Sequence, residues 1–163
     1  MVEQIKSAPR IAKIAPPNKN KKMTIGKTKN KFRYSVFVSI GDTCNEQTVY
    51  WANYSDMLGK AREIFFASIF PKFRELASSG AQIVTHETYI KHISSAYFGD
   101  EIIIEIVVGE VKKTSAKISV DFIMKETGKK IAEGWQVLVF TNNEGRPAPI
   151  PAELKEAVLQ YVV

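Results

Sequence analysis

The sequence has a single cysteine, two histidines and no long apolar run. The lone cysteine, Cys44, excludes a disulfide within the chain and is typical of proteins that stay in a reducing cytoplasm. The longest apolar segments, such as residues 135–140, have the length of a strand and are far too short to span a membrane. Because the first residues also lack the apolar core of a signal peptide, we expect a cytoplasmic protein without membrane contact.

Acidic residues are scarce at the beginning of the chain. Residues 1–33 hold ten Lys or Arg side chains against Glu3 alone, so this part has a charge of +9. The remainder is mildly acidic, with a charge of −3, and the net charge of the chain is +6. This composition predicts a flexible basic segment over residues 1–30. The segment lacks interleaved aromatic residues that would stack on bases, so we expect no nucleic-acid partner. A solvated tail or linker and a docking arm for an acidic protein are both open.

The remaining residues, 31–163, have the size of one domain with a substantial core. Residues 32–40 alternate aromatic and β-branched side chains, which predicts a strand. Helical spacing of apolar residues predicts a long helix over residues 54–70, with a further short helical segment between Pro71 and Gly80. Apolar and alternating patterns predict four more strands, over residues 82–93, 101–111, 115–124 and 130–140. A last short helix is predicted after Pro151, over residues 152–161.

A strand, a long helix and four strands joined by short connections predict an α+β domain with an antiparallel sheet covered on one face by the helix. This order resembles the plan of the hot-dog fold, in which a five-stranded antiparallel sheet wraps around a long central helix. Four segments resemble motifs of the 4-hydroxybenzoyl-CoA thioesterase family of hot-dog proteins: residues 49–54 with 61–63, residues 97–100, residues 134–140 and residues 143–151.

Within that family, Asp42-Thr43 and the segment from Gly59 to Glu63 are most similar to thioesterases that accompany enediyne and related iterative polyketide synthases. The resemblance implies an enzyme that hydrolyses a fatty or polyketide acyl thioester carried on an acyl carrier protein. An acyl-CoA thioesterase of general metabolism and a non-catalytic acyl-binding module are the alternatives. The resemblance implies no cofactor. It also implies a homodimer or dimer of dimers, with apolar acyl tunnels between subunits.

The family resemblance also directs attention to Cys44 and Arg62. Many family members place a catalytic aspartate two residues after the position of Asp42, where this chain has Cys44. The enediyne-type enzymes carry an asparagine there and use hydrogen-bonding residues, including a helix arginine that matches Arg62. Arg62 would hold the thioester or order the attacking water through its permanent charge. Alternatively, it forms a structural pair with a carboxylate such as Glu63 of a second copy.

Thioester hydrolysis needs an oxyanion holder, a positioned water and a proton carrier. The backbone N–H groups of Tyr50 and Trp51 are the candidate oxyanion donors, because a helix start has unpaired N–H groups and a positive dipole end. Alternatively, these two aromatic side chains only wedge the helix against the sheet. In the loop before the helix, Asn45 and Glu46 are the candidates to position water.

The sequence gives less support for a catalytic role of the other titratable residues. Cys44 as a nucleophile would need an activating base, and His86 and His92 lie on a predicted strand distant in sequence, where we expect exposed or structural roles. These residues form no metal-ligand cluster, so no metal site is expected. Tyr54 either contacts substrate or, with Asn53, fixes the helix start. The residues expected to contact substrate are Cys44, Tyr54, Leu58, Glu63 and Phe65, with Ile83 and Val84 adding to the acyl tunnel.

Overall fold

The computed structural model describes residues 31–45 and 47–163, so the predicted flexible segment over residues 1–30 lies outside the described residues. Five strands form one antiparallel sheet in the order β1-β3-β4-β5-β2, which confirms the predicted α+β architecture. The elements are β1 (Phe32–Phe37), η1 (Ile40–Asp42), α1 (Trp51–Ile69), α2 (Phe73–Ser78), β2 (Gln82–His92), β3 (Glu101–Val111), β4 (Ser115–Met124), β5 (Lys130–Thr141) and α3 (Ala152–Leu159).

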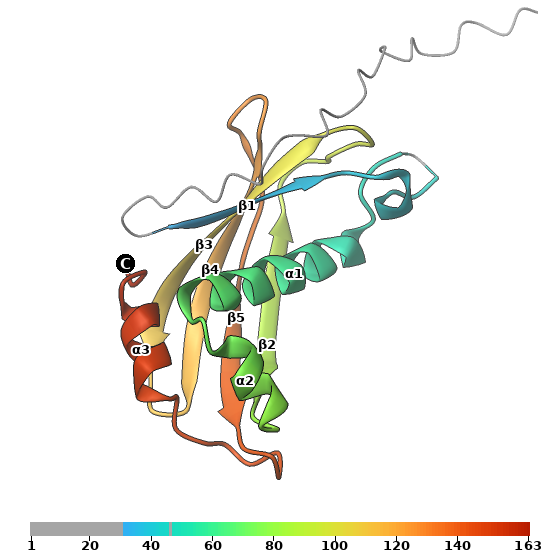
Figure 1. The fold of residues 1–163 in the computed structure, drawn as a ribbon. Helices are drawn as coiled ribbons and strands as arrows, with labels where there is room; N and C mark the ends of the chain where they lie inside the picture. Colours follow the sequence, from blue (N-terminus) through green and yellow to red (C-terminus); the bar gives the residue numbers. More distant parts are fainter. Residues whose placement is uncertain (1–30, 46) are drawn as a thin grey trace, which may run out of the picture.

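The long helix α1 lies across one face of the sheet, and α2 and α3 are on the same side (Figure 1). It begins at Trp51, three residues before the predicted start. Trp51 is exposed and Ala52 and Asn53 are only partly buried, so these residues do not belong to the apolar stripe. One face of α1 is buried by its apolar side chains, namely Tyr54, Met57, Leu58, Ala61, Phe65 and Phe66. No helix in the described residues is both long and apolar enough to cross a membrane.

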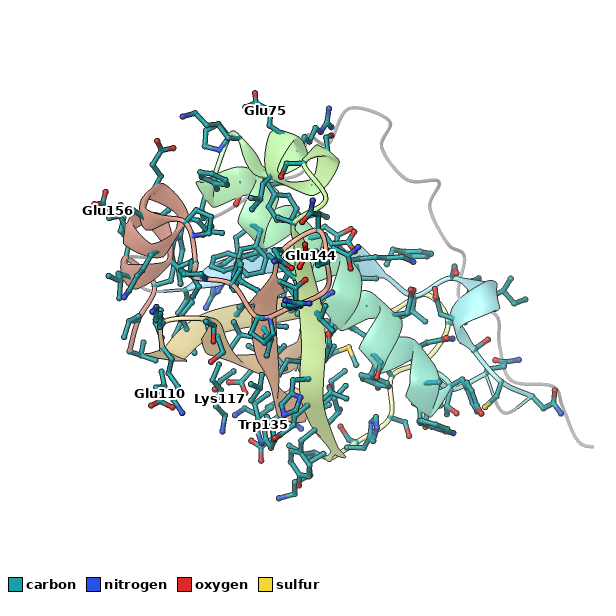
Figure 2. The ribbon with its side chains drawn as sticks, turned by 90° about the horizontal axis from the view of Figure 1, so that it is seen from below. Glu75, Glu110, Lys117, Trp135, Glu144 and Glu156 are labelled. Carbon is teal, nitrogen blue, oxygen red and sulfur yellow. The ribbon has the colours of Figure 1, made fainter. Side chains whose placement is uncertain are left out.

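The central strands β3 and β4 supply the other half of the core. Their alternate residues point toward α1 and are buried, as the two-residue period of a strand requires: Ile102, Ile104, Ile106, Ile118, Val120 and Phe122. The side chains between them point to the opposite face. There, Lys117 Nζ lies 4.2 Å from the centre of the Trp135 ring, and Figure 2 shows both side chains on the side of the sheet away from α2.

Strand β2 forms one edge of the sheet and is the most exposed strand. Only Ile83 and Ile90 of its eleven residues are even partly buried. Its inner edge pairs with β5, where Gly134 allows a close approach, because a Cβ there would lie 2.1 Å from the Tyr89 carbonyl oxygen. The outer edge has no strand partner within the described part of the chain. Its backbone N–H and C=O groups are therefore available to pair with another strand.

Glu105 on β3 is a buried carboxylate on the face away from α1, with a side chain only 4% exposed. It accepts hydrogen bonds from Lys31 Nζ at 2.5 Å and from Arg33 Nε at 2.8 Å. Burial by itself raises the pKa of Glu105, but the bonds from Lys31 and Arg33 more than offset this, so the pKa lies below its ordinary value. Ionised Glu105 therefore holds the edge strand β1 onto β3.

Replacing Glu105 with Gln should lower the free energy of unfolding at pH 7 by about 1–2 kcal/mol, because the charge-assisted bonds are lost. Since the pKa of Glu105 is lower in the folded state, its stabilisation is complete above the unfolded pKa and is lost as the pH falls through the folded pKa. Urea unfolding of both proteins at pH 7 and at about pH 3 checks this. An equal difference in stability at both pH values would contradict it.

Candidate active site

Helix α1 and strand β2 run antiparallel to each other, so residues early in the helix meet residues late in the strand. The Tyr54 and His92 rings are in edge contact, with centroids 4.7 Å apart. Farther along, Arg62 Nη1 donates to Thr85 Oγ1 at 2.6 Å. The start of α1 therefore lies beside the end of β2, and the later turns of α1 lie beside its beginning.

The loop before α1 is held by Asp42. Its side chain accepts a hydrogen bond from the Ser39 N–H at 2.8 Å, and its carbonyl oxygen accepts one from Asn53 Nδ2 at 2.8 Å. Asn53 therefore fixes the helix start, which was one of the two roles considered for this segment. The same carbonyl accepts from the Tyr50 N–H at 2.9 Å. This bond corrects the expectation for Tyr50, because its N–H is already engaged and is not free to hold an oxyanion.

The N–H groups that do remain at the helix start belong to Trp51 and Ala52. Neither has an acceptor among residues 31–45 and 47–163. The N-cap residue Tyr50 provides no side-chain acceptor for them. Two adjacent unpaired N–H groups at the positive end of a helix of 19 residues are suited to an oxyanion. Ala52 was not a candidate from sequence because the helix was expected to begin later.

A pocket of about 290 Å³ adjoins this helix start. It is lined by Val49, Trp51, Tyr54, His92, Ile93, Ser94 and Ser95. His92 thus lies beside the oxyanion donor candidates, although no local pattern in the sequence connects it with residues 51–54. Only the antiparallel packing of α1 on β2 brings the two segments together.

Tyr54 forms the inner wall of this pocket. Its side chain is 2% exposed and packs edge-on against Phe122 as well as His92. Burial raises the pKa of the Tyr54 hydroxyl, a backbone hydrogen bond at Ala96 opposes this, and the charge of Asp100 adds to it. Tyr54 therefore stays neutral and holds the His92 ring in place, whereas contact of Tyr54 with substrate stays a prediction.

Arg62 is half-buried and is held by neutral groups. Besides Thr85, Arg62 Nη1 contacts Gln136 Oε1 at 3.3 Å, and Gln136 is only 5% exposed. Burial lowers the pKa of Arg62, while the charge of Glu63 raises it. No carboxylate forms an ion pair with Arg62 in the described residues. Its positive charge is therefore available to an anionic group from outside the chain.

A second cavity, of about 610 Å³, lies between α1, α2 and β2. Its lining includes Arg62 and Glu63, together with apolar side chains from all three elements: Phe66, Phe73, Leu76 and Ile83. We refer to it as the apolar cleft. Leu58 and Phe65, expected to contact substrate, are 0% exposed and belong to the core, because they face the sheet and not the cleft. Ile83 lines the cleft and Val84 does not, and contact of Ile83 with an acyl chain stays a prediction.

The loop residues lie apart from both cavities. Cys44 and Asn45 are exposed, and Cys44 Sγ is 3.3 Å from Thr48 Oγ1 in a turn that Gln47 closes with a φ of 61°. Glu46 lies outside the described residues. In the described part of the chain, no group of three or more His, Cys, Asp or Glu side chains is placed to hold a metal ion.

Solved structures of several thioesterases are similar to this architecture. The chain is similar in structure to dynemicin thioesterase, whose crystal structures describe polyene binding (TM-score 0.77, 23% identity, 82% of this chain and 99% of that chain). It is also similar to a 1,4-dihydroxy-2-naphthoyl-CoA thioesterase from Synechocystis (0.74, 19%, 80% and 96%). A third similar structure is a variant of 4-hydroxybenzoyl-CoA thioesterase bound to 4-hydroxybenzoyl-CoA (0.72, 18%, 79% and 99%).

These similarities confirm the hot-dog fold. No curated protein sequence matches the chain significantly. The sequence model of one family does match, over residues 38–158, which include every strand except the first and both cavities. The expected class, a thioester hydrolase, is confirmed at the level of this family. The chain belongs to the thioesterase-like superfamily.

Proposed function

We propose that this protein hydrolyses a fatty or polyketide acyl thioester carried on an acyl carrier protein. The observation that carries the proposal is the pair of N–H groups of Trp51 and Ala52 beside the 290 Å³ pocket, neither of which has an acceptor in the described part of the chain. A thioester carbonyl becomes negatively charged at its oxygen when water attacks, and donors held in place by a helix start stabilise that charge without reorganisation. An acyl-CoA thioesterase is the alternative, since two of the similar structures are enzymes for CoA thioesters.

A complete site needs two copies of the chain. Trp51 and Arg62 are separated by about 16 Å along α1, which is too far for both to contact one thioester. On β2, His92 contacts the start of α1 and Thr85 contacts Arg62, and these two residues lie about 23 Å apart along an extended strand. One protomer therefore keeps its candidate oxyanion donors and its available arginine charge apart.

Edge pairing of two β2 strands would bring these groups together. If the strands pair antiparallel about the midpoint Glu87, Thr85 lies opposite the partner's Tyr89 and only about 10 Å from the partner's His92. Arg62 of one copy then approaches the α1 start of the other copy. The apolar cleft of the copy that supplies Arg62 continues from this point and would accommodate the acyl chain. The exposed outer edge of β2 supports such a homodimer.

In this arrangement the thioester oxygen accepts hydrogen bonds from the Trp51 and Ala52 N–H groups. The guanidinium of Arg62 from the second copy stabilises the same developing charge or orders the attacking water. Water attacks the carbonyl carbon, the carbon–sulfur bond breaks, and the carrier leaves with a free thiol. The acyl chain leaves as a carboxylate from the apolar cleft.

The proposal is tested by presenting one acyl chain on an acyl carrier protein and on CoA. We expect hydrolysis of both, with kcat/KM higher by about tenfold or more for the carrier-protein form, because a protein carrier adds contacts outside the pocket. Release of free thiol measures both rates. Turnover of the CoA ester alone would replace the carrier-protein proposal with the acyl-CoA alternative. Acyl binding without any turnover would favour the non-catalytic acyl-binding module.

A further inference from the structure

We infer that His92 is the proton carrier of the proposed thioester hydrolysis, acting first as general base and then as general acid. The inference rests on the proposed function and names a group from another element, strand β2. His92 is the last residue of β2, and its ring lines the same 290 Å³ pocket as Trp51.

The geometry holds the imidazole at the helix start and leaves its nitrogens accessible. The Tyr54 ring contacts the imidazole at an interplanar angle of 77°, so the contact is edge-on. Neither ring nitrogen of His92 has a hydrogen-bond or ion-pair partner among the described residues. His86 has a charged neighbour, because its Nε2 lies 3.6 Å from Glu87 Oε1. Unlike His92, it also lines neither of the two cavities. An accessible imidazole can accept a proton from a water in the pocket.

The rest of the pocket lining offers no other proton carrier. Among residues 31–45 and 47–163, no carboxylate or thiol belongs to the lining. Ser94 and Ser95 contribute hydroxyl groups, which are too weak as acids and as bases to carry the proton without an adjacent base. The hydroxyl of Tyr54 is buried, and its pKa is raised further from neutrality. Among the described lining residues, the imidazole of His92 is thus the side chain whose chemistry suits general acid–base catalysis.

The proton moves through His92 in a closed cycle. Neutral His92 removes a proton from water as the water oxygen bonds to the thioester carbonyl carbon, and the Trp51 and Ala52 N–H groups hold the oxyanion. When the oxyanion collapses to a carbonyl, the carbon–sulfur bond breaks and the imidazolium gives its proton to the leaving sulfur. The products are a thiol and a carboxylic acid, which loses its proton to solvent, and His92 is neutral again.

The test compares His92→Gln with His86→Gln, a matched change on the same strand. We expect H92Q to lower kcat by about 10²–10³-fold with KM nearly unchanged, because general acid–base catalysis contributes on that scale. H86Q should stay within about twofold of the wild-type kcat, because the proposed β2 pairing uses backbone groups and one exposed polar side chain replaces another. In H92A, added imidazole should restore activity by about tenfold or more, since it supplies the missing base. A structural role for His92 would show no such restoration.

The outcomes separate this inference from the proposed function. Hydrolysis by wild type together with a wild-type kcat in H92Q would overturn the role of His92 and leave the thioesterase proposal intact. A reduced H92A rate that imidazole does not restore would also overturn it. No hydrolysis by wild type of either the carrier-protein or the CoA thioester would overturn both. Thermal unfolding of each variant, within a few degrees of wild type for an exposed residue, shows that the fold is retained.

Discussion

Replacing Trp51 with proline should lower kcat for thioester hydrolysis by about 10²–10³-fold relative to Trp51→Ala, because proline removes one oxyanion donor. The substitution suits this position. Proline is favoured as the first residue of a helix, and Trp51 is the first residue of α1. The preceding residue, Tyr50, already has the extended backbone that proline requires before it, with φ −63° and ψ 133°.

Trp51→Ala is the matched control. It removes the 65%-exposed indole but keeps the backbone N–H, so the ratio of W51A to W51P rates isolates the contribution of the donor. Steady-state kinetics on one acyl thioester gives this ratio, and circular dichroism checks that the helix content of both proteins is equal. Equal kcat values in the two folded variants would show that the oxyanion is held elsewhere.

Replacing Arg62 with Ala should lower kcat by about 10²-fold or more, because the proposed two-copy site loses its charge beside the oxyanion. Arg62→Lys should recover only part of the rate, since an ammonium group cannot reproduce the bonds that the guanidinium makes to Thr85 and Gln136. A wild-type rate in R62A would instead assign Arg62 a purely structural role. Both variants are measured as purified proteins with the same acyl thioester.

Mixing W51P and R62A subunits tests whether two copies build each site. A mixed dimer then holds one site with both defects and one site with neither. After random reassembly in equal amounts, about one quarter of all sites are intact, so about one quarter of wild-type activity should return. Activity no higher than that of the separate variants would mean that each chain builds its site alone.

The fold was predictable from residues that follow a regular period. The alternation in β3 and β4 and the helical spacing in α1 directly reflect burial on one face, so the sheet and the long helix were correctly expected. The start of α1 was not, because Trp51 is exposed and residues 51–53 do not continue the buried stripe of the helix. Leu58 and Phe65 fit the same stripe as the cleft residue Phe66, and sequence alone does not distinguish the sheet side of a helix from its cleft side.

The site was less predictable because its contacts join distant segments. Tyr50 was a reasonable oxyanion donor until the fold showed that the carbonyl of Asp42 accepts its N–H. The neutral partners of Arg62 lie on β2 and β5, up to 74 residues away in the sequence. His92 has no motif around it, and it approaches α1 only because β2 runs antiparallel to the helix.

The solitary thiol of Cys44 has a practical consequence. It is exposed in the loop that leads into α1, and the chain contains no other cysteine. A maleimide dye would therefore attach at one known place, outside the lining of both cavities, without any engineered change. Fluorescence from that dye would test in real time whether a carrier protein docks on this loop.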